Sequence, residues 1–274
     1  MSAVGSVWRT EVALPLAALA LVYLTGWTRL TRRSPMRCRP RLLVRLALAL
    51  SGVAAAAVAL VGLHGAAHES FAAHMVQHLL LIVVAVPALL LADPLPAVMW
   101  ALPAAVRHSL RRALVAPAWP RRVWRALTWM PVAWTLHATA LWIWHVPGAY
   151  DAALASGPLH DAEHLVFAAT AALFWWPVID PAPRASTPPP FGWRIVYLVL
   201  GAFQSAALGV FLVAAPRPLY AYGALDDQAL GGVLMWAVGG AVDMGAVLYL
   251  VYRFLGLASL TAPGRQARMS RFDT

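Results

Sequence analysis

Seven long apolar segments constrain the fold of this 274-residue chain more than any other feature. They lie near 11–28, 42–64, 73–92, 129–146, 162–179, 194–214 and 230–252. A helix needs about 20 mostly apolar residues to cross a bilayer. The chain is 61% hydrophobic and 12% charged, against roughly 45–50% and 25% in soluble domains. The sequence therefore predicts an all-α integral membrane protein, with residues 1–274 forming one domain, a bundle of about seven transmembrane helices in lipid.

The positive charge of the chain falls between these apolar segments. The formal net charge is +10, and all 21 basic side chains are arginines. Nineteen lie within 29–45, 93–128, 180–194 and the segment after 252, whereas Arg9 and Arg217 lie in the alternate segments. Because short cytoplasmic loops carry the excess of basic residues, we predict that the N-terminus is outside and the C-terminus is cytoplasmic. Because membrane topology explains where the arginines lie, the positive charge does not indicate a nucleic-acid partner.

The predicted connections contain no soluble domain. In loop 93–128, Pro103 is suited to open a helix that carries arginines on one face and apolar residues on another. These residues are Arg107, Arg111 and Arg112 on one face and Leu102, Val106, Leu110 and Leu114 on the other. We expect this helix to lie in the cytoplasmic interface. The proline-rich segment 180–191 is predicted as an extended linker. The N-terminus lacks a cleavage pattern, so the first apolar segment is expected to remain as a helix.

The histidines are distributed asymmetrically over the predicted bundle. Only His108 falls on the cytoplasmic side. The others are His64 and His68 at the end of the second segment, His74 and His78 at the start of the third, His145 at the end of the fourth, His160 and His164 at the start of the fifth, and His137 about two turns deeper. The pairs 74/78 and 160/164 are each four residues apart, a spacing that places two rings on one helix face.

Two histidine pairs that face each other would supply ligands for a transition metal. Imidazole suits copper, zinc, iron and nickel, and a thioether favours copper, particularly Cu(I). The predicted ligands are His74, His78, His145, His160 and His164, with His64, His68 and Met75 as access or auxiliary ligands, and Glu69, Asp161, Glu163 and Asp227 as carboxylates that orient imidazoles or attract a cation. The lone Cys38 excludes a Cys-x-x-Cys site. We predict copper, with zinc as the alternative.

Several other residues within the predicted spans invite simpler interpretations. Gln204 and Asp243 are polar and are expected to face the bundle, although Asp243 lies deep for a direct metal ligand. Met235 and Met244 are nine residues apart, so at most one is expected to share a site. Tryptophans near the ends of the spans are typical of the membrane interface.

Ordered motifs carry a resemblance to a known family. They are HMVQHLL at 74–80, LWIWHVP at 141–147 continuing to Tyr150, HDAEH at 160–164 with FWWP at 174–177, and Asp227-Gln228 followed by Gly231-Gly232 and Met235-Trp236. Over roughly 60–255 the chain resembles the CtaG-like cytochrome c oxidase assembly proteins of bacteria. The resemblance implies a polytopic plasma-membrane factor for assembly of a haem-copper oxidase, with copper supply to that oxidase as the usual proposal.

The leading hypothesis is a non-enzymatic assembly factor that binds copper at its outer-face histidines and hands it to an oxidase subunit. One alternative is a haem-binding electron carrier, since histidines on neighbouring helices can ligate haem. A second is a metal transporter, with His137, Gln204 and Asp243 on its pathway. A membrane metalloenzyme is a further alternative, because an open histidine-bound metal can activate water.

Overall fold

The structure, a computed structural model, describes residues 9–115, 118–184, 187–221 and 224–261, without the side chains of 37, 111, 113–115, 118 and 257–261. All regular secondary structure in these ranges is helical, which confirms the predicted all-α fold. The elements are α1 (Thr10–Arg33), η1 (Met36–Cys38), α2 (Arg39–Ala57), η2 (Val58–Gly62), α3 (His64–Glu69), α4 (Phe71–Leu79), η3 (Leu80–Ala85), α5 (Val86–Leu91), α6 (Pro94–Ala101), α7 (Ala104–Val115), α8 (Ala118–Leu127), α9 (Met130–Trp144), α10 (Pro147–Ala155), α11 (Gly157–Ile179), α12 (Phe191–Val213), α13 (Leu225–Leu234), η4 (Met235–Gly239) and α14 (Gly240–Thr261).

Six helical stretches in the described ranges are long and apolar enough to cross a membrane. They are Thr10–Arg33, Arg39–Gly62, Phe71–Leu91, Gly157–Ile179, Phe191–Val213 and Leu225–Gly256. The helix predicted at 129–146 is α9, which has only 15 residues, fewer than the roughly 20 that a straight crossing needs. It packs against α11 and α12 within the bundle. The chain is therefore a multi-pass membrane protein with at least these six apolar helices.

Most helix ends extend beyond the predicted apolar segments. Helix α1 continues to Arg33 and α13 begins at Leu225, because polar residues that end an apolar run do not end a helix. The helix predicted near 42–64 is observed over Arg39–Gly62. The π-helical turn η2 ends at Gly62, and His64 begins the separate helix α3.

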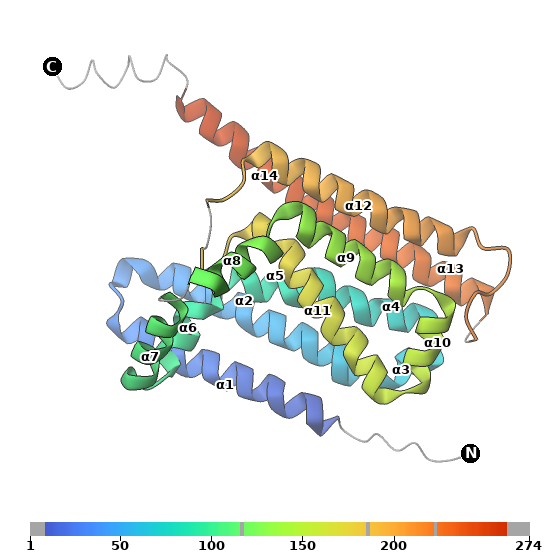
Figure 1. Cartoon of the computed structure of the whole chain (residues 1–274), viewed down its shortest axis with the longest axis horizontal. Helices are drawn as coiled ribbons and strands as arrows, with labels where there is room; N and C mark the ends of the chain where they lie inside the picture. Colours follow the sequence, from blue (N-terminus) through green and yellow to red (C-terminus); the bar gives the residue numbers. More distant parts are fainter. Residues whose placement is uncertain (1–8, 116–117, 185–186, 222–223, 262–274) are drawn as a thin grey trace.

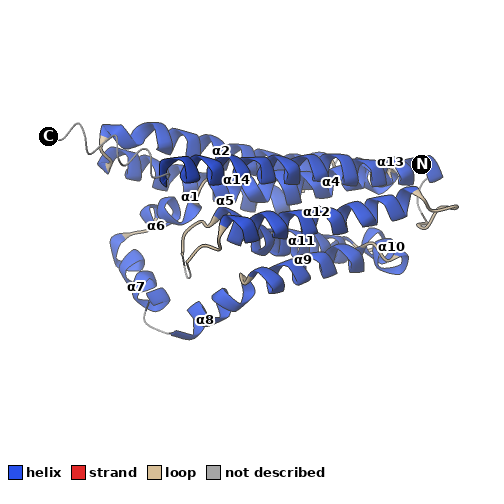
Figure 2. Ribbon diagram, turned by 90° about the horizontal axis from the view of Figure 1, so that it is seen from above, coloured by secondary structure: helices blue, strands red, loops and turns tan. Residues whose placement is uncertain are grey.

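The connection 93–128 holds three helices, α6, α7 and α8, where one was predicted. Asp93 has a left-handed backbone (φ 49°), and Pro94 opens α6 directly after it, since proline fits the first turn of a helix. Helix α7 and the start of α8 stand away from the bundle (Figure 2), whereas Trp124 of α8 packs against Trp176 of α11 with ring centroids 4.7 Å apart. On α7, Val106 and Leu110 are exposed, as expected of an interfacial helix, while the side chains of Arg111 and Leu114 lie outside the described set.

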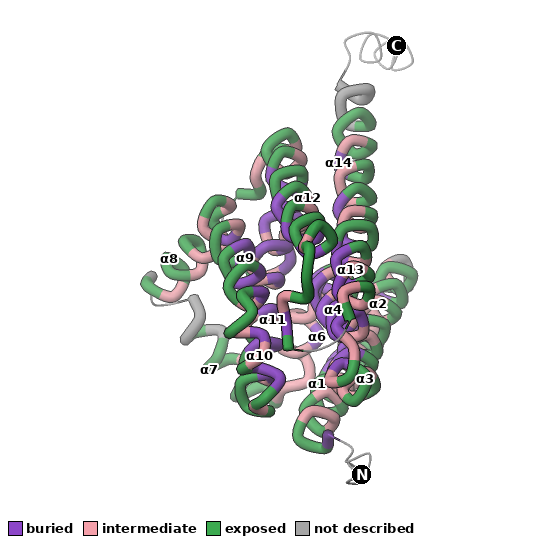
Figure 3. Tube along the Cα trace, turned by 90° about the vertical axis from the view of Figure 1, so that its right-hand side faces the viewer, coloured by how far each residue is buried: buried purple, intermediate pink, exposed green. Residues whose placement is uncertain are grey.

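The core lies between α4, α9, α11, α12 and α13. Buried positions concentrate on α4, α11 and the inward sides of their neighbours (Figure 3). Helices α12 and α13 cross closely, because a Cβ on Gly209 or Gly232 would lie 2.7 Å from the other glycine's carbonyl oxygen. Small residues allow such close crossing in membranes. Large apolar side chains such as Phe203 and Leu248 are exposed on the outer surface, where lipid would cover them.

The two ends of the bundle differ in chemistry. Helices α3 and α10 lie at one end, and α6 and α7 at the other (Figure 1). At the α6 end Arg45 pairs with Asp93 at 2.8 Å, and Arg29 donates to the carbonyl of Ala101 at 2.7 Å. Arginines predicted in the same group at 265, 268 and 271 lie outside the described residues. The predicted separation of histidines from most arginines thus corresponds to opposite ends of the bundle.

Candidate functional site

The start of α4 is fixed by a carboxylate from a distant helix. Asp227, in the first turn of α13, accepts hydrogen bonds from Ser70 Oγ at 2.8 Å and from the amides of Phe71 at 2.6 Å and Ala72 at 3.2 Å. The Ser70 hydroxyl in turn accepts from the amide of Ala73, as a helix N-cap does. Asp227, predicted to act beside an imidazole, instead fixes the start of the helix that carries His74 and His78.

His74 and His78 of α4 meet His160 and His164 of α11 in the interior of the bundle. Both pairs have the four-residue spacing of one helix face. The Nε2 atoms of His74 and His78 are 2.8 Å apart. Ring centroids are 5.0 Å apart for His74 and His160, and 5.3 Å for His78 and His164. The two predicted pairs therefore face each other, and we call these residues the four-histidine centre.

Glu163 joins the four-histidine centre from the same face of α11. Its carboxylate oxygens lie 3.8 Å from His74 Nε2 and 3.6 Å from His78 Nε2. His74, His160 and Glu163 are each 0% exposed. The sequence placed Glu163 beside the ligands, but its position between the two α4 histidines makes it a potential ligand itself.

Apart from Nε2 of His74 and His78, which face each other, the polar atoms of the four-histidine centre and of Glu163 are buried without hydrogen-bond partners. Among the described residues, these atoms are Nδ1 of His74 and His78, both ring nitrogens of His160 and His164, and both carboxylate oxygens of Glu163. Buried polar groups are normally paired, and each exception calls for an explanation. Two ligand groups, His74/His78/His164 and His74/His160/Glu163, have donor atoms within 4.8 Å of one another. Imidazole and carboxylate donors at this spacing fit a copper or zinc ion.

A second, more exposed group lies toward the end of the bundle. His64 and His68 of α3 come together with His160, with donor atoms again within 4.8 Å. Arg9 covers this outer group: its Nη1 lies 3.4 Å from His64 Nδ1, and its Nη2 pairs with Asp161. Partial burial, and then the charge of Arg9, lower the pKa of His64. The sequence did not predict that Arg9 would lie beside this group, because its partner Asp161 is more than 150 residues away along the chain.

His145 belongs neither to the four-histidine centre nor to the outer group of His64, His68 and His160. Its Nδ1 donates to the carbonyl of Leu141 at 2.7 Å, and its Nε2 lies 3.4 Å from the sulfur of Met75. Met75 follows His74 by one residue, so its side chain leaves α4 about 100° further around the helix. His145 and Met75, both predicted ligands, thus contact each other rather than the four-histidine centre.

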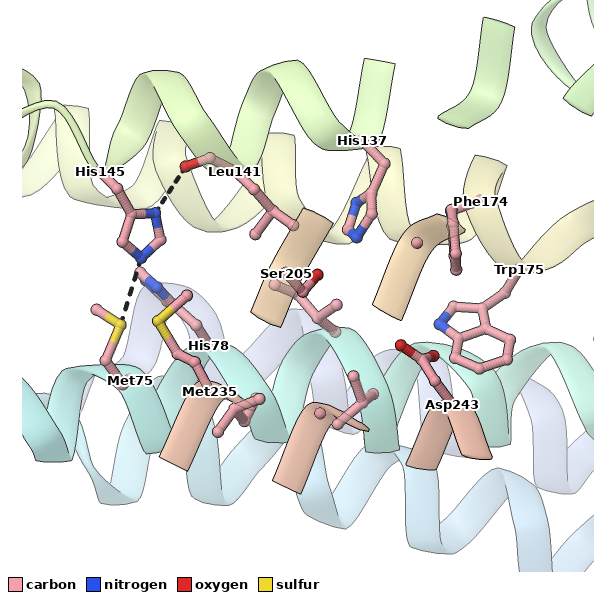
Figure 4. A pocket seen from close by; sticks show the side chains of 15 residues that line it. Met75, His78, His137, Leu141, His145, Phe174, Trp175, Ser205, Met235 and Asp243 are labelled. Carbon is pink, nitrogen blue, oxygen red and sulfur yellow. Dashed lines mark hydrogen bonds between the residues drawn. The ribbon is translucent and has the colours of Figure 1, made fainter. Parts of the chain in front are cut away.

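A small cavity extends from His145 toward the other end of the bundle. It is lined by Met75, His78, His145, Met235, His137 and Asp243, among others (Figure 4). Asp243 was predicted to face the bundle and is buried there. Of the two methionines considered from sequence, Met235 is buried at the cavity and Met244 is exposed. Gln204 is engaged elsewhere, accepting from Trp142 Nε1 at 3.1 Å.

The remaining predicted residues have other surroundings. His108 is on α7, at the opposite end of the bundle from α3 (Figure 1). Glu69 is exposed at the end of α3. π-Helical turns lie close to the histidines: η2 ends just before His64, η3 begins just after His78, and η4 begins at Met235. Such turns occur often at functional sites.

The motifs that build this site lie within one known family. A family model described as cytochrome c oxidase caa3 assembly factor (Caa3_CtaG) matches residues 21–256. The chain belongs to this assembly factor family. The resemblance inferred from the motifs at 74–80, 141–150 and 160–164 is thereby confirmed. No curated protein and no solved structure gives a match to the chain. The matched range contains every histidine of the four-histidine centre and of the outer group, as well as His145.

Proposed function

We propose that this member of the caa3 assembly factor family binds copper at the four-histidine centre and delivers it to a subunit of a haem-copper oxidase. The observation that carries the proposal is the cluster of buried, unpartnered donors from His74, His78, His160, His164 and Glu163. A cation would satisfy these donors together. Zinc fits the same donors and is the alternative cargo.

The arrangement suits transient binding. The outer group of His64 and His68 shares His160 with the four-histidine centre, so an ion can pass between them by exchanging one ligand at a time. Imidazole ligands are neutral, and a site built mainly from them can release a cation to a partner with stronger donors. The role proposed is therefore that of a carrier, not of a catalyst.

We further propose that the chain forms one transmembrane domain with seven crossings, α9 being the seventh, in the bacterial plasma membrane. The N-terminus and the histidine end would be outside, and the C-terminus in the cytoplasm. The distribution of arginines supports this orientation. Copper would then be received and delivered on the extracytoplasmic side.

The test is elemental analysis of the detergent-purified protein beside the variant His74→Ala/His78→Ala. The matched control is His108→Ala, which removes a histidine from the opposite end of the bundle. We expect copper in the wild type and in the control, and loss of copper in the double variant at unchanged helix content. A folded, metal-free wild type that still binds an oxidase subunit would indicate a scaffold and contradict copper delivery.

Two further measurements on the same samples address the other hypotheses. A Soret band would indicate a haem carrier, although the ring separations of about 5 Å within the centre leave no space for a macrocycle between those histidines. Metal uptake into sealed vesicles would indicate a transporter that uses the cavity toward His137 and Asp243. The carrier hypothesis predicts neither signal.

A further inference from the structure

The contact between His145 and Met75 brings two electron-pair donors together. Because a carbonyl oxygen cannot donate, His145 Nδ1 must carry the proton that it shares with Leu141. In a neutral imidazole the other nitrogen is then an acceptor. That nitrogen, Nε2, faces the thioether sulfur of Met75 at 3.4 Å, and the sulfur has no proton to give. Two lone pairs that face each other in a buried place are stabilised by a shared cation.

A second thioether reaches the same position from another helix. Helix α13 crosses α4 at Gly231, where an added Cβ would lie 2.4 Å from the Phe71 ring and 3.1 Å from Met75 Cγ. Met235 follows Gly231 by four residues and so shares the face that meets α4. Met75, Met235 and His145 line the same cavity, and in Figure 4 the side chains of Met75 and Met235 both extend toward His145. The glycine thus permits the approach of the two methionines.

The cavity beside these side chains has room for an ion. It measures about 50 Å³, whereas one water needs about 10–15 Å³ by the same kind of measure. Met75 is 1%, His145 7% and Met235 8% exposed. Two thioethers are soft donors and imidazole also suits copper, so this combination favours Cu(I) over Zn(II).

We propose that Met75, His145 and Met235 form a second metal site, selective for Cu(I), which is separate from the four-histidine centre. His78 connects the two sites, because it belongs to the four-histidine centre and also lines the cavity. The inference rests on the proposed function in taking copper as the cargo, and adds a soft inner site that holds the ion in its reduced form.

The test is an anaerobic titration of the purified full-length protein with Cu(I) against a competing chelator, with Zn(II) titrated separately. The variant Met75→Leu/Met235→Leu keeps side-chain volume, and such swaps are well tolerated in cores. The matched control is Met244→Leu, an exposed methionine on α14. We expect the double variant to lose one equivalent of Cu(I) and to bind Zn(II) as before, and the control to lose nothing. Unchanged Cu(I) stoichiometry and affinity in the double variant would overturn the inference.

A second measurement does not depend on the folding of a variant. X-ray absorption of the wild type loaded with Cu(I) should show sulfur neighbours, and their absence at full occupancy would also overturn the inference. The variant His160→Ala/His164→Ala separates this inference from the proposed function. It should keep the sulfur-bound Cu(I) while losing the ion of the four-histidine centre. Absence of metal from that centre in the wild type, with sulfur-bound Cu(I) retained, would contradict the proposed function alone.

Discussion

Glu163 lies between the two histidines of α4, with one carboxylate oxygen 3.6 Å from His78 Nε2 and the other 3.8 Å from His74 Nε2. Both partners come from a helix that precedes Glu163 by more than eighty residues. The carboxylate is the acidic group of a centre otherwise built from neutral rings. It can therefore set how strongly the centre prefers a doubly charged ion to a singly charged one.

Replacing Glu163 with glutamine should weaken binding of Zn(II) or Cu(II) by about 10–100-fold, the usual cost of losing a group that supports a metal site. The loss should be smaller for Cu(I), because a single charge in a buried site needs less compensation. Competition titrations with each ion would measure both effects. Glu69→Gln, at an exposed position on α3, is the control and should leave both affinities unchanged. Equal losses for the two charge states would argue against an electrostatic role of Glu163.

The hydrogen bonds of Asp227 lead to a prediction about helix placement. Asp227→Ala leaves the amides of Phe71 and Ala72 and the hydroxyl of Ser70 without this acceptor. Each unsatisfied buried group costs about 1–3 kcal/mol. We expect a lower melting temperature in detergent and a reduced metal affinity, since the start of α4 sets the positions of His74 and His78. Asp226→Ala removes an exposed carboxylate from the same turn and should have little effect. Equal melting temperatures for the two variants would show that the tether is unimportant.

Much of the histidine arrangement could be predicted from the sequence. The apolar segments gave the depth of each histidine, and the spacing of four residues gave the shared face of His74 with His78 and of His160 with His164. The depth and the shared face of these histidines both depend only on local features of the sequence, the apolar segments and the helical repeat. The four-residue rule also survives small errors in helix ends, such as the start of α11 at Gly157 where residue 162 was predicted.

The remaining features depend on how distant helices cross, which no local pattern reports. Asp227 meets α4 from more than 150 residues away, and Met235 lines the same cavity as Met75 where α13 approaches α4 at Gly231. A distance of nine residues between Met235 and Met244 indicated that they face apart, but not which one faces inward. Two of the three helices within 93–128, α6 and α8, were missed because the arginines and prolines there hide the short apolar stretches between them.

The crossing at Gly231 gives a prediction with a close control. In Gly231→Ala the new Cβ would lie 2.4 Å from the ring of Phe71, which is fully buried. Overpacking of this kind costs about 1–3 kcal/mol, and it would move α13 away from α4. We expect a lower melting temperature and weaker Cu(I) binding. Gly245→Ala adds a methyl group with nothing within 4 Å and should not lower either quantity. A stable Gly231→Ala protein with normal Cu(I) affinity would contradict the role given to this crossing.

Arg9 leads to a prediction about the rate of metal binding. Its guanidinium lies beside His64 and pairs with Asp161, so a cation that approaches the outer group meets a positive charge. In Arg9→Gln the association rate for Cu(I) or Zn(II) should rise, most clearly at low ionic strength where charges are least screened. Stopped-flow mixing with a metal-loaded indicator would measure this rate. Arg217→Gln, an exposed arginine in the connection between α12 and α13, is the control. A slower rate in Arg9→Gln would instead assign Arg9 a supporting role in the outer group.

The proposed orientation predicts which end of the bundle is reached from outside the cell. In a Cys38→Ser background, Met36→Cys places a thiol at the end of the bundle that carries α6 and α7. Ala155→Cys places one at the opposite end, beside the histidines, and both positions are exposed. A membrane-impermeant maleimide added to intact cells should label only Ala155→Cys, and both variants should be labelled after permeabilisation. This result would place the outer group where extracytoplasmic copper is available. Labelling of Met36→Cys alone in intact cells would reverse the orientation, and the four-histidine centre would then have to receive its ion from the cytoplasm.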